Sequence, residues 1–258
     1  MKKFINDLQA HGRYSFTKKE AASKLNMSDV SLRAALRRQK AAGRITSPVS
    51  GFFVIVPTEY SLTGSPPASW LIDGLCYYLD VNYYVGLLTA ASIHGASHQQ
   101  AQFFQVILSH QHRPLISGRN VIHFHSRKKM KQALTEEVKT PTGYMTVSGP
   151  ESTALDIVRF MNKCGGDGNA ITVISEIAER LNGKVLKKLV HLEDTPVIQR
   201  LGFLLERTGN TSLAQPLENE LQKRVSRRIS LFPGAKPFNP HFNSDWKITY
   251  DADLEPES

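Results

Sequence analysis

The stretch from Phe16 to Val56 constrains the fold more than any other part of the chain, because it contains two clear helix starts close together. Thr17 precedes Glu20 by three residues, which is the spacing of a capping box. Ser28 stands at the second start, and Asp29 follows it in the first turn, where the helix dipole favours an anion. The sequence therefore predicts a short helix up to about residue 25, a tight turn, and a second helix from residue 29 to about residue 42.

The second helix is expected to bury one stripe of its surface and to be followed by a hairpin. Leu32, Ala35 and Leu36 recur at the i, i+3, i+4 spacing of a buried face. Gln39 stands where that stripe calls for an apolar residue. After a glycine at position 43, residues 44–46 and 52–56 are predicted strands joined by a turn over residues 47–51. Helix, turn, basic helix and hairpin in this order are typical of a winged helix-turn-helix, with the hairpin as the wing.

Such a geometry is suited to reading DNA. A helix in the major groove presents its first polar residues and its basic side chains to base edges, whereas other basic groups contact phosphate and set the register. The predicted base contacts are Ser28, Ser31, Arg33 and Arg37, the predicted phosphate contacts are Arg38, Lys40 and Arg44, and Ser47 and Ser50 are candidates in the wing turn. The alternative interpretation is a small helical domain with a solvated basic face.

The charge of the chain is concentrated in this same region. The formal net charge is +9, and residues 1–60 hold 11 Lys and Arg against 4 Asp and Glu, whereas residues 61–258 hold 21 against 19. This asymmetry places the polyanion-binding surface mainly in the first quarter of the chain. The N-terminus lacks the apolar run of a signal peptide, and Cys76 and Cys164 are far apart, so we expect reduced thiols and a cytoplasmic protein.

A change in composition indicates the domain organisation. Residues 57–67 contain three prolines and a glycine, which predicts a linker between an N-terminal domain (residues 1–60) and a C-terminal domain (residues 61–258). The C-terminal domain is expected to be mixed α/β, so the fold class of the whole chain is α+β. A helix is also expected over residues 2–11. In the second domain, helices are expected over residues 68–80, 83–94, 151–163, 169–181, 184–192, 195–209 and 213–226, and strands over residues 103–108, 121–125, 138–147 (a hairpin) and 246–250.

The second domain shows no pattern that is typical of catalysis. Its histidine pairs, such as His94 and His98, have no acidic residue or cysteine close in sequence to complete a metal shell. A nuclease or nucleotidyltransferase needs clustered carboxylates, but Glu151 and Asp156 are five residues apart and do not share a helix face. The glycine-rich turn at residues 165–168 lacks the residues of a phosphate-binding loop. We therefore predict no metal site, no cofactor and no enzymatic activity.

Basic residues nevertheless recur in the second domain. Any single run is more often a solvated face. Together they indicate a second basic surface that would extend the DNA footprint or meet another polyanion such as RNA. Its candidate residues are Arg127, Lys128, Lys129, Lys131, Lys184, Lys187 and Lys188, and a further basic run lies over residues 223–228.

Three segments of the second domain resemble the AbiEi family of antitoxins. Residues 83–95 (YYVGLLTAASIHG) are similar to the family's Tyr-Tyr-Val-x-Leu…His-Gly helix. Residues 149–156 look like its Pro-Glu-x-Thr-x-x-Asp helix start, and residues 199–206 look like its Arg-Leu-Gly-x-x-Leu-Glu segment. With the N-terminal winged helix and the strand at residues 246–248, the resemblance covers nearly the whole chain, and the order and spacing of the segments support it.

The resemblance implies a function. AbiEi proteins are cytoplasmic antitoxins of bacterial type IV toxin–antitoxin systems, which are linked to abortive infection by phage. Their winged helix binds inverted repeats in the promoter of their own operon and represses it. Their C-terminal domain counteracts a nucleotidyltransferase-like toxin, AbiEii, without needing a stable complex with it. In these terms His94, Glu151, Asp156 and Glu206 would keep the fold rather than react.

Two other functions stay open on the sequence. The chain would be a plain transcriptional repressor if its C-terminal half were a dimerisation or ligand-binding domain. It would be an enzyme with an appended DNA-binding domain, for example a nuclease, if the scattered carboxylates met in the fold.

Overall fold

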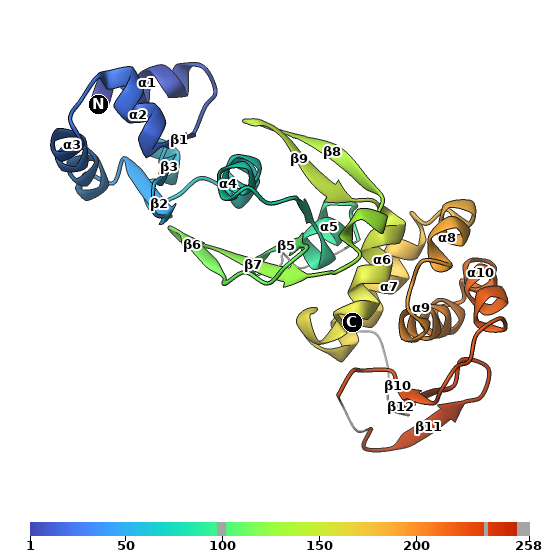
Figure 1. Cartoon of the computed structure of the whole chain (residues 1–258). Coiled ribbons are helices and arrows are strands. Elements are labelled where there is room, and N and C mark those ends of the chain that lie inside the picture. The colour runs from blue at the N-terminus through green and yellow to red at the C-terminus, as the bar shows by residue number, and fades with distance from the viewer. Residues whose placement is uncertain (97–101, 235–236, 252–258) are drawn as a thin grey trace. The chain divides into compact units, whose positions relative to one another are not determined.

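The computed structural model describes residues 1–96, 102–234 and 237–251 (Figure 1). Its secondary structure is α+β, as the sequence predicts. By packing, the chain forms two compact units. The first comprises Met1–Val85, Gln102–Lys128 and Glu137–Val147, and the second comprises Gly86–Ala101, Lys129–Glu136 and Ser148–Ser258. This division differs from the predicted boundary near residue 60, and the domain limits stay a prediction.

The N-terminal part of the first unit has the order of elements of a winged helix-turn-helix. Its elements are α1 (Lys2–Ala10), β1 (Ser15–Thr17), α2 (Lys18–Leu25), α3 (Asp29–Ala41), β2 (Ile45–Val49) and β3 (Phe52–Ile55), with the sheet order β1-β3-β2. The predicted helices and hairpin are confirmed, although β2 is longer than predicted and the turn is shorter. Strand β1 is absent from the sequence prediction, because only its antiparallel pairing with β3 defines it.

The two helix starts form as their capping residues predict. The Thr17 hydroxyl oxygen accepts a hydrogen bond from the Glu20 backbone N–H at 3.0 Å, and the Ser28 hydroxyl oxygen accepts one from the Ser31 N–H at 3.3 Å. The Glu20 carboxylate accepts two hydrogen bonds from the Arg13 guanidinium, at 2.7 and 3.0 Å. Between these elements lies a core of buried apolar residues, namely Ile5, Leu8, Phe16, Ala21, Leu32, Leu36, Ile45, Phe53 and Ile55.

Residues 57–67, predicted as a linker, pack against the turn between β6 (Leu115–Ser117) and β7 (Asn120–Ser126). The Arg119 N–H donates to the Thr63 carbonyl at 2.8 Å. Gly118 has a φ of +58°, and a Cβ at this position would lie 2.2 Å from the same carbonyl oxygen. Only glycine fits this approach of two backbones, so the proline-rich segment is part of the packed unit.

A six-stranded mixed sheet follows, in the order β6-β7-β5-β4-β9-β8. The strands not yet given are β4 (Tyr83–Val85), β5 (Phe104–Leu108), β8 (Thr135–Thr140) and β9 (Gly143–Ser148). The predicted strands over residues 103–108 and 121–125 and the predicted hairpin over 138–147 are confirmed. Strand β6 is absent from the sequence prediction. The predicted helix over residues 68–80 corresponds to the short 3-10 turn Ala68–Trp70 and α4 (Ile72–Leu79).

The predicted helix over residues 83–94 is wrong in its first part. Tyr83–Val85 form the strand β4, which pairs with β5 on one side and with β9 on the other. Tyr84 and Val85 are buried at 1% and 0% exposure, and aromatic and β-branched residues favour such a central strand. Gly86 is extended, and only α5 (Leu87–Ile93) is helical.

The second unit is built mainly of helices. They are α5, α6 (Pro150–Arg159), α7 (Asp167–Ala178), α8 (Gly183–Val190), α9 (Thr195–Arg207) and α10 (Thr211–Leu221). A small sheet closes the unit in the order β10 (Ile229–Ser230), β12 (Ile248–Asp251), β11 (Pro240–Asn243). The helix predicted over residues 151–163 ends at Arg159, where a 3-10 turn follows. The N-cap of α9 is Asp194, and Pro196 lies in its first turn. Within the described parts of the chain, no helix is long and apolar enough to cross a membrane.

Candidate nucleic-acid interface

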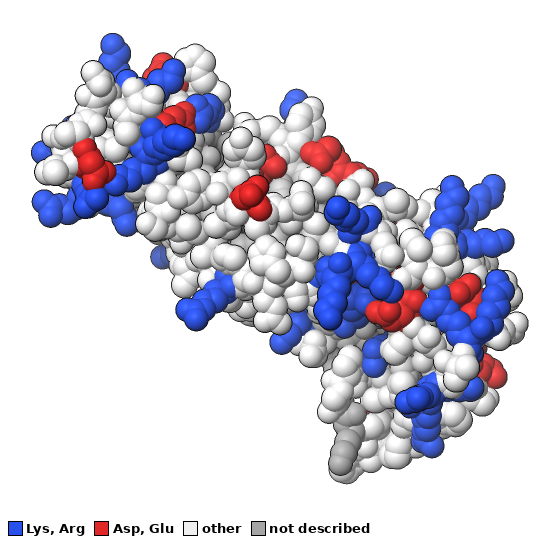
Figure 2. Space-filling model, viewed as in Figure 1, with Lys and Arg blue, Asp and Glu red and all other residues white. Residues whose placement is uncertain are grey.

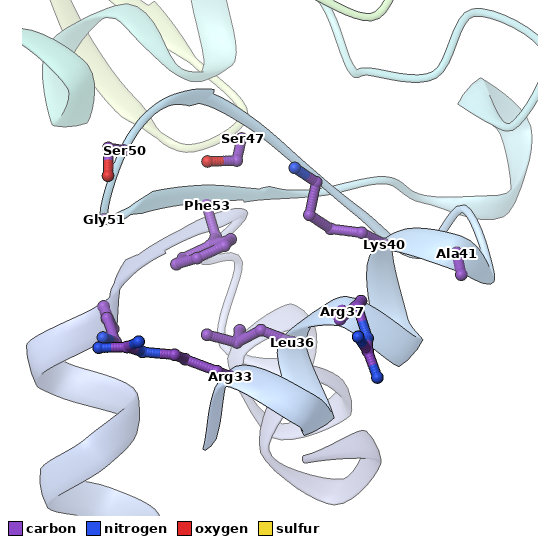
Figure 3. A pocket seen from close by; sticks show the side chains of 10 residues that line it. Arg33, Leu36, Arg37, Lys40, Ala41, Ser47, Ser50, Gly51 and Phe53 are labelled. Atoms are coloured by element: carbon purple, nitrogen blue, oxygen red, sulfur yellow. The ribbon is translucent and has the colours of Figure 1, made fainter. Parts of the chain in front are cut away.

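An open groove of about 700 Å³ separates α3 from the β2–β3 hairpin (Figure 3). Leu36 of α3 and Phe53 of β3 are both largely buried and face each other across it. Polar and basic side chains surround this apolar floor, and Figure 3 shows Lys40 reaching from α3 towards the hairpin. The residues that line the groove are Lys18, Arg33, Leu36, Arg37, Lys40, Ala41, Ser47, Ser50, Gly51 and Phe53.

Local sequence positions α3 for this arrangement. Its inward stripe consists of Leu32, Ala35, Leu36 and Gln39, and its C-terminal end is formed by a glycine at position 43 with a φ of +66°. Gln39 is 7% exposed, and its side-chain oxygen has no hydrogen-bond partner among the described residues. The amide thus takes the place of the apolar residue that the periodicity calls for. With this stripe buried, Arg33 and Arg37 face outwards.

A carboxylate organises the cations at the start of α3. The Asp29 oxygens lie 2.5 Å from the Lys18 Nζ and 2.5 Å from the Arg33 Nη2. The hydrogen bond from Lys18 lowers the pKa of Asp29, and the charge of Arg33 adds to this effect. Lys18 belongs to α2 and is absent from the predicted site residues. The sequence signal for Lys18 is its position directly after the Thr17 cap, at the start of α2. The ion pair with Asp29 shows that this end of α2 lies beside the start of α3.

Five of the nine predicted DNA-binding residues meet in the groove, and four do not. Arg33, Arg37, Lys40, Ser47 and Ser50 line it. Ser28 and Ser31 are exposed at the start of α3, where their hydroxyl oxygens lie 3.0 Å apart. Arg38 is exposed outside the groove. Arg44 is half-buried and donates to the Asn6 side-chain oxygen at 2.6 Å, so its guanidinium is bound to α1.

The candidates for a second basic surface differ in burial and belong to two different units. Arg127 is 4% exposed, and its Nη1 lies 3.3 Å from the Tyr84 hydroxyl, so it is a buried group. Lys128 is exposed in the first unit, whereas Lys129 and Lys131 are exposed in the second, where Lys129 lies 3.3 Å from an Asp194 oxygen.

Three further lysines are exposed on α8. Lys184, Lys187 and Lys188 share one face of this helix through their i, i+3, i+4 spacing. Figure 2 shows basic side chains gathered over α8 as well as around α3. The later run over residues 223–228 is partly structural, because the Arg224 guanidinium donates to backbone carbonyls at Glu193 and His191.

The residues that the AbiEi resemblance assigns to the fold make structural contacts. A ring nitrogen of His94 lies 2.7 Å from the Ser148 carbonyl oxygen, and Glu151 accepts from the Asn182 N–H at 2.7 Å. Asp156 is fully buried beside Arg159, with 3.5 Å between a carboxylate oxygen and Nε. Glu206 accepts from the indole N–H of Trp246 at 2.6 Å. Among the described residues no three His, Cys, Asp or Glu side chains are grouped to hold a metal, and His98 lies outside those residues.

Packing also explains why the segment over residues 199–206 contains a glycine, Gly202. A Cβ on Gly202 would lie 2.0 Å from the ring of Trp246, which is 1% exposed. The indole therefore packs directly on the backbone of α9. Glycine and glutamate one turn apart hold one aromatic side chain, which explains this segment in physical terms.

Comparison with known families identifies the central part of the chain. Residues 84–207 match the family model described as the AbiEi antitoxin C-terminal domain. The chain carries an AbiEi antitoxin domain. The match begins at the second residue of the first segment that resembles the family, and it contains the other two segments completely.

The fold as a whole is similar to that of a solved structure. The RV2827C protein from Mycobacterium tuberculosis superposes with a TM-score of 0.73 at 15% sequence identity, and the match covers 96% of this chain and 89% of that one. At this identity the likeness shows the fold alone. No curated protein matches the chain.

Proposed function

We propose that this protein is an antitoxin that also represses its own operon. Its winged helix binds operator DNA with inverted repeats, and its AbiEi domain counteracts a nucleotidyltransferase-like toxin without a stable complex. The observation that supports DNA binding is the groove between α3 and the hairpin, to which α2 contributes Lys18 and α3 contributes Arg33, Arg37 and Lys40. The observation that supports antitoxin function is the AbiEi domain over residues 84–207.

The groove suggests how each part contacts DNA. α3 enters the major groove, where Arg33 and Arg37 reach base edges, and Lys40 and the wing serines Ser47 and Ser50 contact the flanking backbone. Phosphate contacts release counterions, so affinity falls steeply with salt, with a slope of about −0.9 per neutralised phosphate. Two copies of the chain would bind the two halves of an inverted repeat, since a two-fold operator matches a two-fold pair of proteins.

The exposed lysines of the AbiEi domain are a second candidate surface. Lys187 and its neighbours on α8 carry charge outwards. Together with Lys129 and Lys131 of the same unit they would contact DNA flanking the operator or an RNA bound by the toxin. Removing these charges tests that role without disturbing the winged helix.

The test separates repression from antitoxicity in the full chain. The variant Arg33→Ala/Arg37→Ala/Lys40→Ala is compared with the wild type for binding to a duplex of the chain's own promoter, at low and at high salt. In cells, the neighbouring gene is induced from a promoter that this protein does not control, and survival is measured with each variant. We expect the triple variant to lose DNA binding and to keep the rescue.

Each outcome has a clear meaning. Rescue by the triple variant would assign antitoxicity to the AbiEi domain independently of repression. Loss of both properties would mean that DNA-bound protein is the protective form. If neither protein rescues the cells while the wild type represses its promoter, the protein is a plain repressor, which is the alternative function.

A further inference from the structure

The outward face of α3 has an apolar centre, which the groove residues do not explain. Residues of a helix follow one another at about 100° around its axis. The inward side is defined by the buried Leu32, Ala35, Leu36 and Gln39. Val30 lies opposite the centre of that side, and it is 79% exposed. Ala34, which is half-buried, follows four residues later and lies about 40° further around the axis, and its small side chain leaves room for close approach.

Hydrogen-bonding groups flank this apolar ridge of Val30 and Ala34. Arg33 and Arg37 lie along the side that faces the groove, as Figure 3 shows. Ser31 lies on the other side of the ridge. An apolar ridge with hydrogen-bonding groups on both sides differs from a uniformly solvated basic face.

An exposed valine brings no benefit to the helix itself. β-Branched residues lose rotamer freedom in a helix, and valine is a weaker helix former than alanine, lysine or arginine. Val30 touches none of the core of this region, since its side chain is exposed. Among the exposed apolar side chains, Val30 is distinguished by its place on the outward face of α3, between Arg33 and Ser31.

We infer that Val30 reads a thymine in each operator half-site, through contact with the C5-methyl group in the major groove. This inference rests on the proposed DNA binding and specifies a base that it recognises. The thymine methyl is the apolar group that a base pair presents in the major groove, and burying it against valine methyls removes apolar surface from water. A cytosine in its place would present an amino group that valine cannot pair with, so the contact discriminates against it.

The experiment is a selection from random duplexes by the full chain, carried out with the wild type and with Val30→Ala. A matched control is Val225→Ala, which removes the same methyl groups from a side chain that is 92% exposed in the second unit. Each thymine of the selected site is then replaced singly by deoxyuridine, which removes only the methyl group. Binding constants are measured for each protein at one salt concentration.

We expect one thymine in each half-site whose replacement weakens binding about threefold to tenfold for the wild type and for Val225→Ala. For Val30→Ala the same replacement leaves binding unchanged, and selection at that position is relaxed. The inference is overturned if deoxyuridine weakens the binding of Val30→Ala as much as that of the wild type, or if no thymine shows a methyl effect. In either case, sequence-selective binding would leave the proposed function intact. Absence of selective, salt-sensitive binding by the wild type would overturn both.

Discussion

The arginines on the outward face of α3 and two arginines of the AbiEi domain have opposite surroundings. On α3, Arg33 and Arg37 are exposed around an open groove. In the AbiEi domain, Arg127 is 4% exposed beside a tyrosine hydroxyl, and Arg159 lies among the carboxylates of Asp156 and Glu193. A run of basic residues in a sequence therefore says little about surface charge until burial is known.

The largest expected effect is a loss of stability when Arg159, which lies among the carboxylates of the AbiEi domain, is replaced. Arg159→Ala leaves Asp156 and Glu193, at 0% and 3% side-chain exposure, without their guanidinium partner. Breaking a buried ion pair from one side costs about 3–5 kcal/mol of the free energy of unfolding. Urea denaturation measures this loss. The matched control Arg180→Ala removes an exposed arginine from the same domain and should change the stability by less than about 0.5 kcal/mol. Equal effects of the two changes would break the comparison.

The next effect concerns packing in the same domain. Gly202→Ala drives a methyl group into the Trp246 ring, so either the indole or α9 must shift. Overpacking of this kind costs about 1–3 kcal/mol. The matched control is Gly183→Ala at the start of α8, where the nearest atom to an added Cβ is 3.7 Å away. Thermal unfolding followed by tryptophan fluorescence separates the two, and a neutral Gly202→Ala would contradict the packing of Trp246 on α9.

The outward-facing arginines should act on binding and not on stability. Arg37→Ala should weaken operator binding by about 1–3 kcal/mol if this side chain reads a base, because its hydrogen bonds to the base edge are lost. The free energy of unfolding should stay the same within about 0.5 kcal/mol, because the side chain is exposed. Fluorescence anisotropy and urea denaturation give the two numbers, with Arg180→Ala as a control for the loss of one charge. A stability loss without a binding loss would assign Arg37 to the fold.

The smallest effect is expected at Asp29, the carboxylate that pairs with Lys18 and Arg33. Asp29→Asn frees both cations for DNA and removes a charge that repels phosphate, so binding at low salt should tighten about twofold to threefold. The hydrogen bond from Lys18 keeps the pKa of Asp29 below its ordinary value. The ion pairs are therefore intact above the ordinary pKa and are lost only as the pH falls through the lowered one. The difference between the two proteins should hold throughout the neutral range, and weaker binding by Asp29→Asn would show that Asp29 positions the cations rather than competing for them.

Burial also explains the two cysteines. It raises the pKa of the Cys76 and Cys164 thiols to about 12, so both are neutral at physiological pH. The sequence prediction of reduced, non-paired thiols agrees with two buried free side chains. Neither thiol has the lowered pKa of a reactive cysteine.

Features that depend on neighbouring residues could be predicted from the sequence. Thr17 and Ser28 cap their helices through hydrogen bonds to backbone groups three residues away, and such contacts need no tertiary structure. α3 with its groove residues Arg33, Arg37 and Lys40 followed from these caps and from the helical period. The hairpin with Ser47 and Ser50 followed from the pattern of strands and turn. The segments that resemble AbiEi antitoxins were likewise readable, because their residues are continuous in the chain.

Features that depend on distant partners were decided only by the tertiary structure. Tyr83–Val85 became a strand because β5 and β9, from later parts of the chain, pair with both of its edges. Arg127 became a buried group because the sheet brings it to Tyr84, 43 residues earlier in the chain. Lys18 lies in the groove, where its ion pair with Asp29 holds it at the start of α3. Local hydrogen bonds and helical periodicity depend on residues close together in the sequence. Strand pairing and burial depend on contacts between distant residues, and these contacts determined which of the charges are exposed.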